Sequence, residues 1–401
     1  MQKKQFWSLD KAVFLATGLG LLTGYVQSPL LMKLAAGVGQ VFINLLQLIS
    51  LPIIFLSIVS TLANMQDITH IKIIGRKIIG YTLLTTVIAA SLALLIFRII
   101  NPLSTVISTG DVATTLPGVQ SSYLKFVLDI IPANVIQALG NNNQVISVVF
   151  IAVGLGIAIL SLPKEDKEPL QNFFRSLFAA LLKVTTFIMY VIPVGVWAFM
   201  SLFMKDMQGS SVNLGSIGWY VACVLIANVV QGFIILPLFL KWKGISAQKT
   251  AHGMMPALMT AFFSKSSNIA LPFSMECAQN NLKLSKKVSS IAFPLCSVIN
   301  MNGCAAFIVL TVLFVGSLGG MQFTLFDQWM WVAIASIAAV GNAGVPMGCF
   351  FLSTALLNGM GASVEPMMII LPIYTLIDMV ETTLNVWSDA CVATVVDKEV
   401  K

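Results

Sequence analysis

Apolar residues run along this chain in long stretches, and short polar segments separate one stretch from the next. A helix needs about 20 mainly apolar residues to cross the hydrocarbon core of a bilayer. The pattern therefore predicts eight membrane-spanning helices, at about 11–28, 31–64, 73–100, 124–162, 168–204, 213–240, 284–316 and 366–396. Several stretches exceed one perpendicular crossing, so we expect those helices to tilt, kink or extend beyond the bilayer.

Two further apolar stretches, about 246–282 and 329–362, are interrupted near their middle. Small and polar residues followed by a proline stand there, at Ser264–Pro272 and Gly341–Pro346. We predict that both stretches are re-entrant hairpins, whose backbone must be buried in protein or line a cavity. Each hairpin is followed by a helix, and the two pairs enter from opposite sides. This inverted repeat predicts a binding site where the hairpin tips meet.

Lys and Arg gather at the ends of these stretches and predict the topology. If each span crosses once and each hairpin enters and leaves on one side, all basic clusters fall on the same face, which identifies it as cytoplasmic. Both termini are then cytoplasmic, and we expect a bacterial-type inner membrane. The clusters are Lys3, Lys4 and Lys11; Lys72, Arg76 and Lys77; Lys164 and Lys167; Lys241, Lys243 and Lys249; Lys283, Lys286 and Lys287.

Composition supports a multi-pass membrane protein in contact with the lipid bilayer. Hydrophobic residues make up 57% and charged residues 10% of the 401 residues, whereas soluble domains carry about 25% charged residues. The net charge of +7 follows the topology and not a basic patch, so nucleic-acid binding is not expected. The sequence has no phosphate-binding glycine motif, Ser/His/Asp arrangement or metal-ligand spacing, and we expect no enzyme.

The last span carries a polar stripe. Its members are spaced so that they share one face of a helix, about 100° wide. Buried carboxylates in a membrane helix cost several kcal/mol unless they are paired, protonated or bound to an ion. No Lys or Arg occurs between Lys287 and Lys398, and Lys265 at the first hairpin could pair with only one of the acids. We therefore predict a site for a substrate and a cation, formed by Asp378, Glu381, Thr382, Asn385 and Asp389.

A second polar run, Asn300–Gly303, lies in the middle of the span at 284–316. Two Asn and a Gly in an apolar helix favour local unwinding, which frees carbonyl groups to coordinate a cation such as Na⁺. Asn also joins helices in any membrane bundle, so this run alone leaves both readings open.

Taken together, Ser264–Pro272, Asn300–Gly303, Gly341–Pro346 and Asp378–Asp389 resemble the dicarboxylate/amino acid:cation symporter family, which has the glutamate-transporter fold. The resemblance covers nearly the whole chain. It implies an all-α protein with eight transmembrane helices and two re-entrant hairpins, which assembles as a homotrimer and works by an elevator mechanism. It also implies scaffold helices in 1–71 and 103–210, and a transport domain in 72–102 and 211–401.

The resemblance also implies roles for individual residues. Asp378 would bind the substrate amino group, Asn385 and the hairpin serines its carboxylate, and Gly344–Pro346 would gate the site. The implied substrate-binding residues are Ser266, Ser267, Asn268, Val345, Asp378, Glu381, Thr382 and Asn385. The implied sodium ligands are Cys296, Asn300, Asn385 and Asp389. A second candidate sodium site comprises Val298, Met301, Ala339 and Asn342.

Two departures from the family pattern predict the substrate and the ion count. Glu381 stands where acidic-substrate members carry Arg, and a Glu repels a substrate carboxylate that Arg would bind. Asn302 stands where many relatives have Asp, which weakens a further cation site beside Thr85 and Thr86; Thr82 replaces the tyrosine of that site.

We therefore expect a sodium-coupled importer of small neutral amino acids, most similar to the serine/threonine:sodium branch, with fewer sodium ions than the acidic-substrate members. Two alternatives stay open: a cationic substrate paired with Glu381, and coupling to protons in place of sodium.

Overall fold

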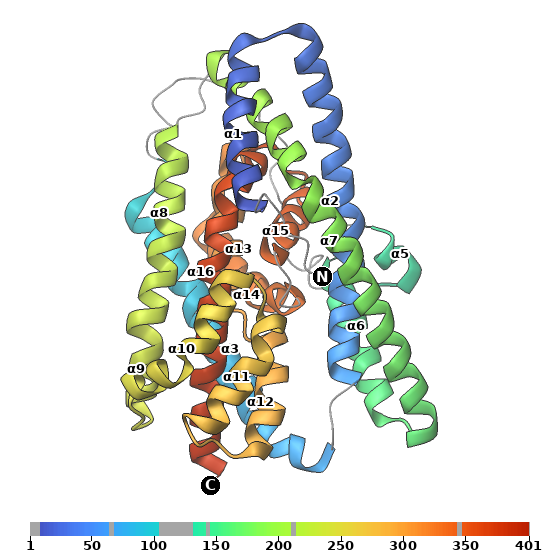
Figure 1. Cartoon of the computed structure of the whole chain (residues 1–401), viewed down its shortest axis with the longest axis vertical. Coiled ribbons are helices and arrows are strands. Elements are labelled where there is room, and N and C mark those ends of the chain that lie inside the picture. Colours follow the sequence, from blue (N-terminus) through green and yellow to red (C-terminus); the bar gives the residue numbers. More distant parts are fainter. Residues whose placement is uncertain are drawn as a thin grey trace, which may run out of the picture.

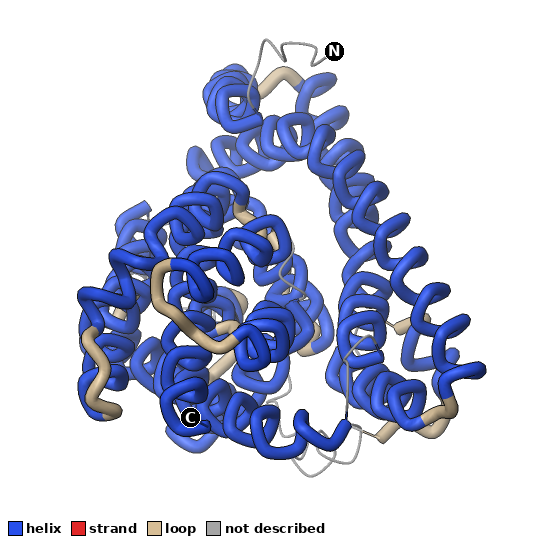
Figure 2. The backbone as a smooth tube through the Cα atoms, turned by 60° about the horizontal axis from the view of Figure 1, so that its bottom comes forward, coloured by secondary structure: helices blue, strands red, loops and turns tan. Residues whose placement is uncertain are grey.

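The structure is a computed structural model that describes residues 9–63, 68–103, 131–141, 145–209, 214–342 and 347–400. Every regular element in these ranges is a helix, which confirms the all-α class (Figure 2). The helices are α1 (Leu9–Val26), α2 (Pro29–Ala63), α3 (Ile68–Ile100), α5 (Val135–Leu139), α6 (Val145–Ser161), α7 (Lys164–Gly209), α8 (Leu214–Val230), η1 (Gln231–Ile235), α9 (Leu236–Trp242), α10 (Ala247–Ser264), α11 (Ser267–Asn280), α12 (Lys286–Ile299), α13 (Asn302–Leu318), α14 (Leu325–Ala338), η2 (Ala339–Asn342), α15 (Gly348–Gly359) and α16 (Glu365–Val400).

Within the described ranges, four stretches are long and apolar enough to cross a membrane: Ile74–Ile100, Gly215–Trp242, Lys286–Leu318 and Ile369–Val400. Shorter apolar helices accompany them, which agrees with a multi-pass membrane protein. The count of eight crossings stays a prediction. Of the predicted span at 124–162, residues 124–130 and 142–144 lie outside the described residues.

The helices gather in two groups (Figure 1). In the first, α7 packs along α1 and α2, and α6 packs on α2. In the second, α13 and α16 lie at the centre, with α3, α8, α10 and α12 around them. Residues 302–316 of α13 are all buried, because this apolar helix faces protein on every side. The division into scaffold and transport domains stays a prediction, and the first group falls within the predicted scaffold ranges.

Two interruptions occur where the polar runs predict them. α10 ends at Ser264, Lys265 adopts a left-handed conformation (φ 54°), and α11 begins at Ser267 and packs on α10. α12 ends at Ile299, and the next two residues, Asn300 and Met301, are not helical. Both breaks leave main-chain groups without helical partners at the level of the polar stripe.

The second interrupted stretch is α14, η2 and α15. The capping box of Thr324 and Asp327 starts α14, and Met347 in a left-handed conformation (φ 62°) precedes α15. The residues between Asn342 and Met347, which include Val345 and the whole predicted gate, lie outside the described residues.

One feature of the fold was not predicted. The span at 213–240 is a single continuous helix that contains a π-turn, η1, between α8 and α9. Such turns contain an extra residue and occur often at functional sites. The amide of Gln231 in this turn donates to the Thr85 carbonyl at 3.2 Å, and the carbonyl of Gly232 accepts from Trp387 Nε1 at 3.0 Å.

Candidate functional site

The polar stripe of α16 lies inside the protein. The exposed fractions of its members range from 1% for Glu381 to 6% for Thr382. A lipid-facing stripe would leave these groups unsolvated, whereas an inward-facing stripe can contact neighbouring polar groups. The five predicted members Asp378, Glu381, Thr382, Asn385 and Asp389 are all buried.

The break between α12 and α13 contacts the C-terminal part of the stripe, at Ser388 and Asp389. The side-chain amide of Asn300 donates to Asp389 Oδ1 at 3.0 Å and to Ser388 Oγ at 2.9 Å. The oxygen of the same amide accepts from Thr85 Oγ1 of α3 at 3.3 Å. Asn300 is fully buried, so it joins α3, the break and α16 in one polar network.

Close packing brings the first turn of α13 against α16. The amide N–H of Gly303 donates to Asn385 Oδ1 at 2.8 Å. A Cβ at Gly303 would lie 2.9 Å from the Cα of Glu381. Only glycine permits this approach, so Gly303 fixes how deeply the break inserts toward the stripe.

Glu381 lies in an apolar and aromatic pocket. Its Oε2 accepts from the hydroxyl of Tyr374 at 3.1 Å, and the thiol of Cys349 lies beside the carboxylate. Its Oε1 is buried and makes no hydrogen bond to another described residue. Phe307 and Phe350 pack against the Tyr374 ring, with centroids 4.8 and 5.3 Å away. One carboxylate oxygen is therefore fixed while the other can accept a hydrogen bond.

Asp378 lies one turn away from Glu381 along α16. Its Oδ2 accepts from the backbone N–H of Met347 at 2.9 Å, directly before α15. The charge of Lys265 at the first hairpin also acts on this carboxylate. Asp378 thus contacts the residue that begins the second part of the second interrupted stretch, and the site between the hairpin tips stays a prediction.

The tip of the first hairpin packs against α16. Ser266 and Ser267 are buried, with 4% and 3% exposed, and Asn268 is half-buried. Behind the tip, Ala261 and Ala270 form an apolar cluster with Val386 of α16. Val386 directly follows Asn385 in sequence, so this cluster packs the hairpin tip beside that part of the stripe.

The residues of the two candidate sodium sites are all buried. At the first site, the Cys296 carbonyl accepts from the Asn300 backbone N–H at 2.8 Å. At the second, the Asn342 amide lies 3.7 Å from the Met301 sulfur, and its Oδ1 lacks a hydrogen-bond partner among the described residues. Oxygen atoms are the ligands that hard cations prefer, and the second site contains this buried, unpartnered oxygen.

The region of the Asp-to-Asn departure contains further unpartnered oxygens. The hydroxyls of Thr82 and Thr86 and the Oδ1 of Asn302 are buried without a partner in the described part of the chain. The amide of Asn302 donates to Ser388 Oγ. Asn302 and Thr82 stand where the resemblance implies the carboxylate and the tyrosine of relatives, whereas Thr86 is retained.

Sequence reasoning missed three groups of the site: Tyr374, Ser388 and Gln231. Ser388 lies between Asn385 and Asp389 in sequence, and Gln231 is a long polar residue inside an apolar span, so both carried a signal. Tyr374 carried none, because an aromatic residue in an apolar helix indicates core packing.

The profile of the sodium:dicarboxylate symporter family matches residues 9–399. The chain belongs to this family, which confirms the predicted resemblance, and it is a membrane transporter and not an enzyme.

Curated relatives match almost the full chain. They include the human neutral amino acid transporter A (26% identical; 94% of this chain and 78% of the relative). The proton/glutamate-aspartate symporter of Escherichia coli is 26% identical, covering 98% of this chain and 93% of the relative. The L-cystine uptake protein TcyP of Bacillus cereus is 28% identical, covering 96% and 88%. The substrates named for these relatives thus differ although the identities are similar.

Proposed function

We propose that this chain is a secondary active symporter that imports small neutral amino acids, serine and threonine above others, together with Na⁺. Membership of a symporter family and relatives named for amino acids support the general activity. The observation that carries the substrate class is Glu381, buried at 1% exposure with one carboxylate oxygen unpartnered among the described residues.

The chemistry of Glu381 disfavours acidic substrates and favours hydroxyl-bearing ones. A second carboxylate beside Glu381 would add a like charge in a site shielded from water, where repulsion is strong. A serine or threonine hydroxyl could instead donate to Oε1, while Tyr374 holds Oε2. Asp378 would bind the substrate ammonium group, and the hairpin serines and Asn385 its carboxylate.

The sodium proposal rests on Asp389. Its Oδ1 accepts from a neutral amide, that of Asn300, so a bound cation would balance its charge. The neutral Asn302 supports fewer sodium ions than in acidic-substrate members, down to one. We also propose that three copies assemble in a bacterial-type inner membrane with cytoplasmic termini, and that the transport domain moves as an elevator.

Two rival functions use the same groups. In the first, Glu381 pairs with the side chain of a cationic amino acid. In the second, Glu381 or Asp378 carries a proton, and the Escherichia coli relative is named as a proton symporter. Excess arginine or lysine competing with labelled serine would favour the first rival. Uptake driven by a proton gradient without sodium would favour the second.

The deciding experiment is binding of an amino acid panel to the purified chain, with NaCl or choline chloride. We expect sodium-dependent binding of serine and threonine, with weak binding of aspartate and arginine. Glu381→Arg should reverse the preference for serine over aspartate, whereas Glu168→Gln, on the exposed surface of α7, should leave it unchanged. If well-folded Glu381→Arg still binds serine normally and ignores aspartate, Glu381 does not select the substrate.

A further inference from the structure

Consecutive residues in the last turn of α16 contact three different parts of the protein. Asp397 accepts from the backbone N–H and hydroxyl of Ser285 at 3.0 and 2.6 Å, at the start of α12. The ammonium of Lys398 donates to the carbonyls of Lys243 and Gly244 at 2.8 and 3.0 Å, directly after α9. The end of α16 is therefore tied to segments that lie far from it in sequence.

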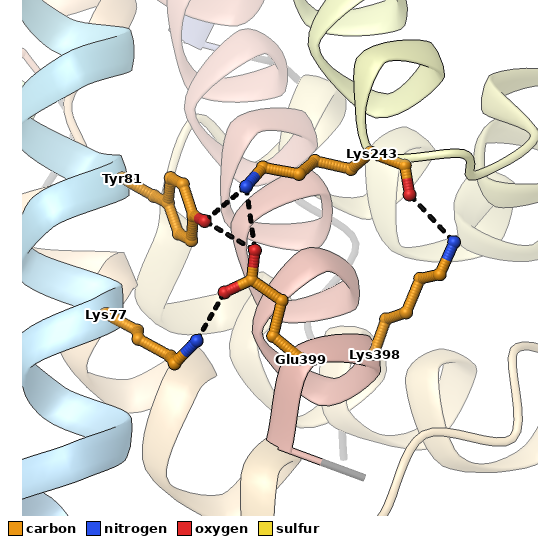
Figure 3. Close-up of polar contacts among 5 residues, drawn as sticks. All are labelled: Lys77, Tyr81, Lys243, Lys398 and Glu399. Atoms are coloured by element: carbon orange, nitrogen blue, oxygen red, sulfur yellow. Dashed lines mark hydrogen bonds and ion pairs between the residues drawn. The ribbon is translucent and has the colours of Figure 1, made fainter.

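The third residue, Glu399, has the most extensive set of contacts (Figure 3). Its Oε2 accepts from Lys77 Nζ at 2.5 Å. Its Oε1 accepts from Lys243 Nζ at 2.7 Å and from the Tyr81 hydroxyl at 2.6 Å. Lys77 and Tyr81 lie one turn apart on α3, so Glu399 joins α16 to both α3 and the end of α9.

The contacts of Lys243 close this cluster into a network. Its ammonium also donates to the Tyr81 hydroxyl at 2.6 Å and lies 4.5 Å from the centroid of the Trp242 ring. The hydrogen bonds that Lys243 donates to Glu399 and, to a smaller extent, to Tyr81 raise its pKa above the usual value. Networks of this kind hold their geometry better than isolated surface pairs.

Tyr81 links the network to the polar core through α3. Thr85 lies one turn further on, about 6 Å along the helix, and its hydroxyl donates to Asn300 Oδ1 at 3.3 Å. Asn300 in turn donates to Asp389 at 3.0 Å. The position of α3 relative to α16 is thus fixed at two levels, by Glu399 at the end of α16 and by Asn300 at the proposed cation site.

We infer that Glu399 is a positioning residue for the coupling cation: by holding Lys77 and Tyr81, it sets the height and rotation of α3 at which Thr85 orients Asn300 toward Asp389. This inference rests on the proposed coupling of transport to a cation at Asp389. Glu399 itself would not touch the cation, because it lies ten residues beyond Asp389 on α16, about 15 Å along the helix.

The test measures cation binding without requiring a substrate. The full chain, purified in detergent, is titrated with NaCl against choline chloride at constant ionic strength, and Tm is followed because a cation that binds the folded state raises it. A parallel titration with pH covers a proton. The variants are Glu399→Gln, which removes the charge, Tyr81→Phe, which removes one hydroxyl, and the conservative Glu399→Asp.

We expect Glu399→Gln and Tyr81→Phe each to raise the half-saturating sodium concentration by about threefold to tenfold. This is less than the roughly 10- to 100-fold cost of removing a group that directly orients a metal ligand. Glu399→Asp should recover most of the affinity. The control Glu168→Gln breaks an exposed ion pair to Lys164 on α7 and should leave the half-saturating concentration unchanged.

Each other outcome has a distinct meaning. If Glu399→Gln lowers Tm in the absence of sodium but keeps the wild-type half-saturating concentration, Glu399 is only a structural anchor and the inference is wrong. If the wild-type chain responds to pH and not to NaCl, the sodium proposal fails, and the same comparison of variants is made in the pH titration. If the wild-type chain responds to neither, both proposals fail.

Discussion

The carboxylates in the middle of α16 and the carboxylate at its end have different hydrogen-bond partners. At the end, Glu399 contacts two ammonium groups, those of Lys77 and Lys243, at 2.5 and 2.7 Å. In the middle, neutral groups donate to Glu381 and Asp389: a tyrosine hydroxyl and a side-chain amide. One helix therefore carries a carboxylate paired with ammonium groups of the protein and two others that accept hydrogen bonds from neutral groups. Under the proposed function, this difference, and not burial alone, distinguishes the carboxylates of the transport site from a structural one.

The strongest test of this contrast is Asp389→Asn. If the charge of Asp389 is balanced by a bound cation, the variant should lose sodium-dependent stabilisation, with at least a roughly 100-fold rise in the half-saturating concentration, because direct ligands exceed their supporting groups in importance. The Tm shift with NaCl measures it. The matched control Asp327→Asn disturbs the cap of α14 and should lower Tm without changing sodium dependence. Wild-type sodium dependence in Asp389→Asn would remove Asp389 from the site.

A smaller effect is expected from Tyr374→Phe, which removes the hydrogen bond to Glu381 and keeps the ring. Hydrogen bonds to charged groups contribute about 1.5–3 kcal/mol, so serine binding should weaken roughly tenfold or more as Glu381 loses its fixed orientation. Binding of labelled serine at saturating sodium measures the change. Tyr220→Phe is the control, since this buried tyrosine hydrogen-bonds to Thr311 at 2.7 Å and not to a carboxylate. Equal serine binding in both variants would contradict the role of Tyr374.

Asn302→Asp tests the same comparison by adding a carboxylate beside the middle of α16. The unpartnered oxygens of Thr82 and Thr86 lie in the same polar region, and a carboxylate strengthens a site for a hard cation. Uptake should then depend on sodium more steeply, with a Hill coefficient rising by about one as a second ion binds. An unchanged sodium dependence in a folded variant would mean that the neutral residue does not limit the ion count.

The smallest expected effect is the pH dependence of the stability that Lys243 contributes at the end of α16. Because Glu399 and Tyr81 raise the pKa of Lys243 above its usual 10.5, its ion pair stabilises the folded chain fully below about pH 10.5 and is lost as pH rises through the higher folded-state value. The Tm difference between wild type and Lys243→Met should therefore be constant from neutral pH to mildly alkaline pH and shrink above that. A difference that does not change with pH would mean that the charge of Lys243 does not stabilise the folded chain.

The sequence predicts the polar centre of this protein well and its periphery poorly. The resemblance to the symporter family implied that Asp389 and Asn300 lie at one sodium site, and their side chains are hydrogen-bonded to each other. The break at Asn300 and the turn at Lys265 are visible in the sequence, because polar residues interrupt apolar stretches there. The role of Glu399 is not, because a charged residue at a helix end normally indicates a solvated surface. The π-turn is also hidden, because an added residue leaves an apolar stretch apolar.

The predicted partner of the acids illustrates a further limit. Sequence left open whether Lys265 serves Asp378 or Glu381, and its charge acts on Asp378 at least. Lys265 itself lies in the left-handed turn between α10 and α11. Helical periodicity contains no information about such a turn.

The π-turn at Gln231–Ile235 changes the direction in which the residues after it face, within one continuous helix. Gln231 points toward α3, where its amide meets the Thr85 carbonyl, and Lys243, just past the end of α9, meets Glu399. Each residue advances an α-helix by about 100°, so deleting one residue from the turn would restore regular α-helix and rotate α9 by roughly that angle. Lys243 would then face away from Glu399 while Gln231 kept its place. The extra residue is thus what allows one end of this helix to face the polar core and the other to face the last turn of α16.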